Sequence, residues 1–348
     1  MNDRTGLRAG KLAPDLLRDL LGDGTDLPTE VQLGPALGED ACAIAVDAGT
    51  LVAATDPITL TGSEVGGHAV HINANDVAVM GVAPRWFLAA VMLPVGTREA
   101  TVRALFDGMR AVLREVGACL VGGHTEVTDA VTQPVVVGQM LGLATDAEVV
   151  ATGGARPGDA IVQVGPTPVE GAAVLALEAA ERLGSLSPTQ RERARGAIRD
   201  PGISVVRPAL LAARHGAHSL HDPTEGGIAT GLAEIAAASG VRLVVREDEV
   251  AWFEPGVEVC RAVGADPWGT LASGALLAAF GPDDVAAALD ALGAADFEAH
   301  VIGEASPGSG LVGSDGAALP VFARDEVSRV LEDIGRAAGN DPSRNRSR

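Results

Sequence analysis

The sequence predicts a two-domain α/β (α+β) protein, and three observations support this fold class. The chain has 348 residues, whereas an ordinary domain has about 150, so we expect two hydrophobic cores. Hydrophobic residues make up 47% of the chain and aromatic residues only 3%, so both cores are expected to consist mainly of Ala, Val, Leu and Ile. Short β-prone segments alternate with helical patterns along both halves, which favours helices packed on sheets.

The first domain is expected to span residues 1–155. Thr97 is placed to cap one of its helices, and Gly117 is placed to end that helix. A stretch dense in turn-forming residues near 150–160 predicts the domain boundary. The expected elements, in chain order, are a helix at 16–21, strands at 41–46 and 50–55, a helix at 64–80, a strand at 86–93, a helix from 97 to about 115, and strands at 118–123 and 134–144.

The second domain is expected to span residues 156–337, and the polar residues 338–348 are expected to form a disordered tail. Thr167, Pro168 and Glu170 have the spacing of a capping box, which predicts a helix start. The expected elements are a strand at 160–165, a helix from 167 to about 183, helices at 203–215, 226–238, 282–291 and 324–337, and strands at 242–246, 274–280 and 299–303.

The charge balance restricts the partners of the protein. A formal net charge of -20 creates a field that repels nucleic acids and anionic membrane surfaces, so neither is expected as a partner. A bound polyphosphate would need its own charge offset locally, most simply by Mg²⁺ held on carboxylates. For most of the 46 acidic residues, a solubilising surface is the simpler interpretation.

Several classes of site are excluded by what the sequence lacks. Lys11 is the only lysine and lies in a polar N-terminal stretch, so a Walker A lysine, a protein-kinase strand lysine and a Schiff-base lysine are not expected. The cysteines, Cys42, Cys119 and Cys260, have no paired spacing, which argues against a disulfide framework or a zinc knuckle. Neither an apolar leader nor a membrane-length apolar run occurs, so we expect a cytoplasmic protein.

Two acidic positions flank the first strands. Asp40 stands at the entrance of the strand at 41–46, where a carboxylate sits on rigid backbone yet faces solvent, as a metal ligand does. Asp56 ends the apolar run TLVAAT and precedes a proline. Both patterns also fit ordinary turns, so each residue is either a metal ligand or a turn residue on this evidence alone.

The helix predicted at 64–80 carries unusual polar residues. His68, His71 and Asn75 share one helical face, and Asn73 and Asp76 share the adjacent face. Asn and Asp side chains compete with the backbone for hydrogen bonds inside a helix, so their presence there indicates a structural or functional role. They could align ligands to phosphate and Mg²⁺, or they could form a helix–helix or dimer interface. A zinc site is not expected, because no third soft ligand lies nearby.

Two glycine-rich segments follow predicted strands. Gly122 and Gly123 could bring backbone N–H groups close to an anion, with Thr125 as a hydroxyl donor and Glu126 as a metal ligand. The alternative is an ordinary turn.

The segment HDPTEGG lies directly before the helix at 226–238. Asp222 or Thr224 could cap this helix, and with Gly226 and Gly227 its N-terminus would favour phosphate. A simple N-cap explains the threonine but not the two carboxylates. Ser273, before a predicted strand, is a weaker candidate for close approach to a ligand.

Six motifs together resemble the aminoimidazole ribonucleotide synthetase-like (PurM-like) superfamily, and the resemblance extends over nearly the whole chain. Within it, NANDVAVMGVAPR and HDPTEGGIATGLAEIA look most like the hydrogenase maturation (HypE) family. The resemblance implies an N-terminal sheet domain that dimerises into a barrel-like core, a C-terminal α/β sandwich, and ATP with a divalent metal near the dimer interface. The motifs are GEDA (38–41), TDP (55–57), NDVAVMG (75–81), GGHTE (122–126), DPTEGG (222–227) and SGALL (273–277).

The resemblance also assigns roles. It makes Asp40, Asp56, Asp76 and Asp222 metal- and phosphate-binding carboxylates, with Asn75 beside them and Gly122 and Gly123 approaching phosphate. Two departures stand out: His124 occupies a position that is often aspartate, which leaves Glu126 as a substitute ligand, and the chain ends in RNRSR where HypE proteins carry a terminal cysteine.

We therefore expect a homodimeric, ATP- and Mg²⁺-dependent HypE-like enzyme. It is expected to phosphorylate an amide, carbonyl or hydroxyl oxygen of a separate small-molecule or protein-borne substrate, with Asp56, Asp76 and Asp222 in catalysis and His68 among the nucleotide contacts. The alternatives are a small-molecule kinase resembling thiamine monophosphate kinase and a non-catalytic nucleotide-binding partner in a maturation complex.

Overall fold

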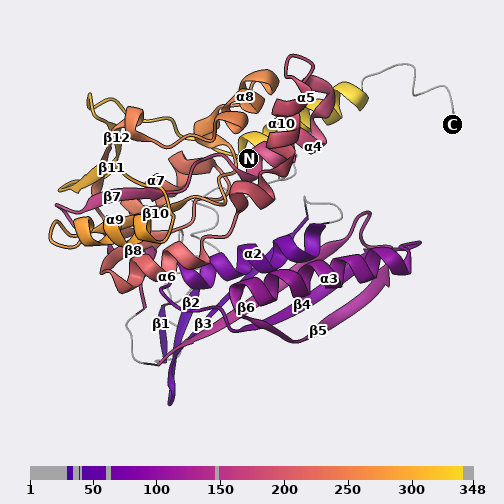
Figure 1. Ribbon diagram of the computed structural model, residues 1–348, viewed down its shortest axis with the longest axis horizontal. Coiled ribbons are helices and arrows are strands. Elements are labelled where there is room, and N and C mark those ends of the chain that lie inside the picture. The colour runs from indigo at the N-terminus through magenta and orange to yellow at the C-terminus, as the bar shows by residue number, and fades with distance from the viewer. Residues whose placement is uncertain (1–29, 34–38, 40, 60–63, 146–148, 340–348) are drawn as a thin grey trace, which may run out of the picture.

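The chain forms two six-stranded sheets, one from each half (Figure 1). The computed structural model describes residues 30–33, 39, 41–59, 64–145 and 149–339. The predicted mixed α/β architecture with two sheet domains is confirmed. Three predictions lie outside the described residues, namely the helix at 16–21, Asp40, and the tail from residue 340 onward.

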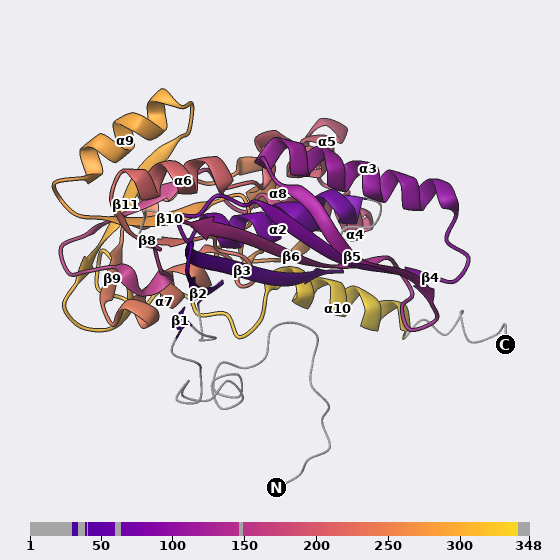
Figure 2. The same cartoon turned by 90° about the horizontal axis from the view of Figure 1, so that it is seen from below.

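The first sheet has the strand order β1-β2-β3-β6-β4-β5, in which only the β4–β5 pair is parallel. Two helices cover one of its faces, and α2 packs directly on β3 and β6. Figure 2 shows the strands in front of these helices, with the opposite face of the sheet uncovered by any described helix. The elements are β1 Val31–Leu33, β2 Cys42–Val46, β3 Gly49–Ile58, α2 Val65–Ala78, β4 Trp86–Pro94, α3 Glu99–Val116, β5 Cys119–Thr128 and β6 Val135–Ala144.

The two helices differ because their surroundings differ. Helix α3 is amphipathic and buries Leu105, Met109 and Leu113, which are spaced four residues apart on one face. It ends at Gly117, whose left-handed φ of 76° matches the predicted stop. Helix α2 is buried on nearly every side, because the sheet lies on one face and the second domain on another. Its mid-helix polar residues are therefore interior residues.

The second sheet has the order β12-β9-β11-β7-β10-β8, in which only the β9–β12 pair is parallel. Strand β10, which pairs with β7 and β8, is buried along its full length. The elements are β7 Ala160–Val164, α4 Glu170–Glu178, α5 Pro188–Gly196, α6 Val206–Arg214, β8 Ala217–His221, α7 Gly227–Ser239, β9 Arg242–Val245, α8 Glu254–Val263, β10 Leu276–Phe280, α9 Val285–Ala294, β11 Ala299–Ser306, β12 Gly310–Gly313 and α10 Glu326–Gly339.

The two domains share a continuous core. Helix α6 of the second half packs against α2 of the first, and one hydrophobic cluster runs from Val77 on α2 through Ala209 on α6 to Phe280 on β10. Burial of aliphatic surface at roughly 25 cal/mol per Å² favours this arrangement. Packed helices thus hold the two domains together.

Two predicted helix caps are wrong. The N-cap of α3 is Arg98, and the Thr97 hydroxyl donates instead to the Pro94 carbonyl at 2.7 Å. The capping box at Thr167 is also wrong, because α4 begins at Glu170 without any side-chain cap. Glu170 is not available for capping, since its carboxylate contacts the other domain.

Other local predictions need correction. Gly122 and Gly123 lie inside β5, as the strand predicted at 118–123 has them, so the alternative of an ordinary turn is wrong. Gly123 has φ of 141°, and a Cβ there would lie 2.1 Å from the Ala89 carbonyl oxygen of β4, so the glycine permits strand pairing. Helices α5 and α8 were not predicted, although α5 opens with a capping box at Ser187. Helix α10 continues to Gly339, past the predicted start of the tail at 338.

Among the helices of the described residues, none combines the length and the apolar sequence that a membrane span requires.

Candidate functional site

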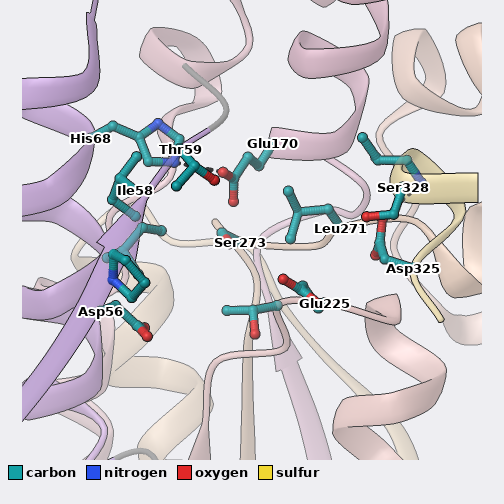
Figure 3. A pocket seen from close by; sticks show the side chains of 14 residues that line it. Asp56, Ile58, Thr59, His68, Glu170, Glu225, Leu271, Ser273, Asp325 and Ser328 are labelled. Atoms are coloured by element: carbon teal, nitrogen blue, oxygen red, sulfur yellow. Dashed lines mark hydrogen bonds and ion pairs between the residues drawn. The ribbon is translucent and has the colours of Figure 1, made fainter. Parts of the chain in front are cut away.

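A cavity of about 150 Å³ lies between the domains. The first domain contributes the end of β3 and one face of α2, and the second contributes the start of α4, the loop before α7, the segment before β10 and the start of α10 (Figure 3). Interdomain clefts of this kind are the usual position of a small-molecule site. The described lining residues are Asp56, Pro57, Ile58, Thr59, His68, Ile72, Glu170, Thr224, Glu225, Leu271, Ser273, Asp325, Val327 and Ser328.

Asp56 is fixed by a buried amide on α2. The Asp56 backbone N–H donates to Asn73 Oδ1 at 2.9 Å, and Asn73 Nδ2 donates to the Ala69 carbonyl at 2.8 Å. Gly138 on β6 permits this contact, because a Cβ there would lie 2.4 Å from Asn73 Nδ2. Asn73 therefore has a structural purpose, which is to hold the strand end that carries Asp56.

His68 and Glu170 form a buried ion pair across the cleft. His68 Nε2 lies 2.6 Å from Glu170 Oε1, and the two side chains are only 2% and 7% exposed. Burial by itself would raise the pKa of Glu170, but the charge of His68 and its hydrogen bond outweigh burial, so the pKa is lowered. Glu170 is therefore a carboxylate, and the pair joins α2 to α4.

Asp325 occupies the N-terminus of α7. Its Oδ2 accepts from the Gly226 N–H at 2.8 Å, and its Oδ1 accepts from the Val327 N–H at 2.7 Å. Burial raises the pKa of Asp325 to about 7, the negative charges of Glu225 and Glu170 add to the rise, and the two backbone donors limit it. The helix terminus predicted to favour phosphate thus already holds a carboxyl group of the same chain.

Packing accounts for both glycines of this segment. Gly226 and Gly227 have φ of 82° and 67°, which a residue with a side chain rarely adopts. A Cβ on Gly227 would lie 2.4 Å from the Trp268 carbonyl oxygen, and one on Gly226 would lie 2.2 Å from Thr230 Oγ1. The chain requires both glycines for its own fold, and contact with a nucleotide stays a prediction.

The structure brings several predicted residues to the cleft or beside it. Asp56, His68 and Thr224 line the cavity. Asp76 is four residues after the lining residue Ile72, so it lies one turn further along the same face of α2, and it is only 5% exposed.

Asp222 and Asn75 are close in sequence to residues that line the cleft. Asp222 is 1% exposed and stands two residues before Thr224. The Asn75 amide joins the domains: Nδ2 donates to the Ile203 carbonyl at 2.8 Å, and Oδ1 accepts from the Val205 N–H at 2.9 Å. Its predicted role toward a nucleotide is untested.

The GGHTE residues are not brought to this cleft within one chain. Gly122, Gly123, Thr125 and Glu126 lie on β5, which is separated from β3 by β6 and β4. Three strand spacings of about 4.8 Å place them roughly 14 Å from β3. His124 and Glu126 form an exposed pair, with His124 Nε2 3.6 Å from Glu126 Oε2.

The donor groups fit Mg²⁺ delivered with a polyphosphate better than a preformed metal site. Among the described residues, no three His, Cys, Asp or Glu side chains gather in a metal-binding arrangement. Mg²⁺ commonly binds one or two carboxylates together with phosphate oxygens and water. Asp56, half-buried at the cavity, offers the hard oxygen that such an ion requires.

Three cleft carboxyls were not predicted as site residues. Glu170 was assigned to a capping box, and Glu225 and Asp325 had no assigned role. The two carboxylates of DPTEGG were the one signal for Glu225, because a simple N-cap does not need both. Nothing local marks Asp325, which reaches the site only through the docking of α10.

The fold and the cleft together define a class: two-domain α/β proteins with an acidic cavity between two sheet domains. The model of the N-terminal domain of AIR synthase related proteins matches residues 38–144, and that of their C-terminal domain matches residues 156–316. The chain belongs to this PurM-like AIR synthase related family.

Three relatives illustrate the similarity. Carbamoyl dehydratase HypE of Cupriavidus necator is 31% identical over 287 residues, which cover 80% of this chain and 78% of that protein. Thiamine-monophosphate kinase of Methanospirillum hungatei is 28% identical over 229 residues, 62% of this chain and 72% of that protein. A crystal structure of hydrogenase maturation protein HypE in complex with ATP superposes with a TM-score of 0.70 at 25% identity, covering 85% of this chain and 92% of that one.

Proposed function

We propose that this protein is an ATP- and Mg²⁺-dependent enzyme that phosphorylates an amide, carbonyl or hydroxyl oxygen of a substrate. The observation that carries the proposal is Asp56, fixed by Asn73 at an acidic interdomain cavity. A HypE structure in complex with ATP superposes on 85% of this chain, which supports ATP as the phosphoryl donor. The first domain, residues 1–155, would bind ATP, and the second, residues 156–337, would complete the cleft.

The chain's residues would divide the work of the reaction. Asp56 would hold Mg²⁺, with Asp76 and Asp222 as the further carboxylates, and the ion would neutralise charge on the phosphates. The substrate oxygen attacks the γ-phosphorus, and the bond to the ADP oxygen breaks. The contact between His68 and Glu170 crosses the cleft, so it would hold the two walls in a fixed relative position.

The experiment is a turnover assay with a panel of amides and alcohols, in which ATP consumption, free phosphate and phosphorylated product are followed. We expect magnesium-dependent turnover that EDTA removes and added Mg²⁺ restores. Asp56→Asn should abolish it, whereas the same change at Asp47, exposed in the β2–β3 turn, should not. Unchanged turnover in Asp56→Asn would contradict the assignment.

A kinase that leaves phosphate on its product is the second candidate. The similarity to thiamine-monophosphate kinase of Methanospirillum hungatei supports it. The same assay separates the two: free phosphate indicates that an activated oxygen is displaced, and a stable phosphorylated product indicates a kinase.

We also propose a homodimer formed through the first sheet. Strand β5 is an edge strand that is exposed from Val121 to Val127, and these two valines are 53% and 59% exposed. An exposed edge strand of this length presents unpaired backbone N–H and C=O groups, which proteins usually protect with another element or another chain. A second copy placed there could bring Thr125 and Glu126 toward a neighbouring cleft. Val127→Asp should shift the mass in light scattering from dimer to monomer, and a monomeric wild type would end this proposal.

A further inference from the structure

The start of helix α10 forms one side of the cleft. Asp325, Val327 and Ser328 line the cavity there. Figure 3 shows Asp325 and Ser328 on the side of the cavity away from Asp56. Helix α10 packs against α4, and Val327 is buried at its start. The position of the first turn of α10 therefore sets the shape of this side of the cavity.

The Asp325 carboxyl joins this side to the loop before α7. Its Oδ2 accepts the Gly226 N–H at 2.8 Å, and its Oδ1 accepts the Val327 N–H at 2.7 Å, so each oxygen has a backbone donor. Gly226 directly follows Thr224 and Glu225, which line the cavity. The positions of these two lining residues are therefore linked to α10 through the side chain of Asp325.

Other contacts attach α10 to the second domain without touching this loop. Glu326 Oε2 accepts the Asp266 N–H at 2.9 Å and lies 2.6 Å from Arg329 Nη2. Glu326 is not among the described residues that line the cavity. A change confined to Asp325 should thus leave α10 docked, so its link to the loop can be tested in a folded protein.

The Asp325 carboxyl exists in both protonation states near neutral pH. The residue is 3% exposed, and burial raises its pKa to about 7; the two N–H donors limit the rise, and the charges of Glu225 and Glu170 add to it. Burial also raises the pKa of the Cys260 thiol to about 12, so this neighbour stays neutral. The titratable and charged groups near Asp325 within the described residues are Glu225 before α7, Glu170 on α4 with its partner His68, Cys260 on α8, Asp266, and Arg324, Glu326 and Arg329 on its own element.

Protonation of Asp325 would weaken its link to the loop. A carboxylate accepts hydrogen bonds at both oxygens, whereas a carboxylic acid uses one oxygen as an O–H donor. Both Asp325 oxygens face N–H donors, and hydrogen bonds to charged groups are the stronger ones. The neutral form therefore cannot keep both contacts at full strength.

We propose that Asp325 is a positioning residue for the substrate that accepts the phosphoryl group. Its carboxylate holds Thr224 and Glu225 at the cavity by fixing the Gly226 N–H relative to the start of α10, and its protonation releases that loop. The inference rests on the proposed function, because it takes the loop to face that substrate. Asp325 acts through the loop and not on the reacting atoms.

The test is hydrogen–deuterium exchange of the full chain, followed in peptides that contain the Gly226 amide and corrected for the intrinsic effect of pH on exchange. In the wild type we expect protection of this amide to rise about ten-fold between about pH 6 and about pH 8. Asp325→Asn keeps the volume and has no ionisable group, so the rise should disappear. Glu326→Gln is the matched control, because it alters α10 away from the loop and should keep the rise.

The turnover assay of the proposed function gives a second readout. At about pH 8, Asp325→Asn should raise the KM of the accepting amide or alcohol about ten-fold, whereas the KM of Mg-ATP should change by less than about two-fold. Glu326→Gln should leave both KM values within about two-fold of the wild type.

The proposal is overturned if the Gly226 amide of the wild type shows no rise in protection, if the rise persists in Asp325→Asn, or if that variant leaves the KM of the accepting substrate unchanged. It is also overturned if Glu326→Gln removes the rise, because the docking of α10 would then set it. A wild type that turns over no substrate would reject the proposed function, and the exchange profile would still decide whether Asp325 holds the loop.

Discussion

The His68–Glu170 pair should contribute measurably to the stability of the whole chain. Both side chains are almost fully buried, and removal of one partner from a buried pair typically costs about 3–5 kcal/mol. Glu170→Gln keeps the volume and one hydrogen bond, so we expect about 2–4 kcal/mol, and a similar loss for His68→Gln. The loss of unfolding free energy in the double variant should be about 1–3 kcal/mol smaller than the sum of the two single losses. Each single variant leaves one partner of the pair uncompensated, whereas the double variant leaves neither.

Urea denaturation of the four proteins measures this coupling. The unfolding experiments are done at neutral pH. Because the pKa of Glu170 is lowered in the folded state, the carboxylate stabilises the fold fully above about pH 4.5, and this contribution is lost as pH falls through the folded-state pKa. The exposed Glu99–Arg103 pair is the control, with a 2.5 Å contact but side chains 77% and 74% exposed, and Glu99→Gln should cost at most about 0.5 kcal/mol. Single losses at His68 and Glu170 that simply add, within about 0.5 kcal/mol, would refute the reasoning.

Two further predictions concern stability. His71 has a pKa lowered to about 4 by burial and by His68, so the folded state resists protonation and loses about 2 kcal/mol between pH 7 and pH 5. His71→Gln should remove that part of the pH dependence in urea titrations, and an unchanged pH profile would contradict it. Gly227→Ala should cost more than Gly240→Ala, by at least about 1 kcal/mol in thermal or urea unfolding, because both glycines have a left-handed φ but only the first would place a Cβ 2.4 Å from the Trp268 carbonyl oxygen. Equal losses would show that the backbone conformation alone sets the cost.

Much of the fold could be predicted from local pattern. Alternation and helical spacing located most strands and helices, because the buried face of each element repeats with the period of that element. The acidic Asp56 and the polar face of α2 could be found in the same way. Their common signal is a polar residue where local structure does not require one.

Several of the remaining errors share one physical cause, which is contact over long sequence separations. Glu170 fits a capping box locally, yet its partner His68 lies 102 residues away. The strand predicted at 118–123 ends at Gly123, yet pairing with β4 extends β5 to Thr128. Asp325 joins the cleft only because the start of α10 docks on the second domain, where α10 packs against α4, and its contact with the Gly226 N–H spans 99 residues.

The most direct measurement is calorimetric titration of a non-hydrolysable ATP analogue into the full chain, with and without Mg²⁺. We predict saturable binding that requires Mg²⁺, is lost in Asp56→Asn and survives in Asp47→Asn. If the analogue gave no heat in either condition, or bound Asp56→Asn as tightly as the wild type, a nucleotide site at this cleft would be ruled out.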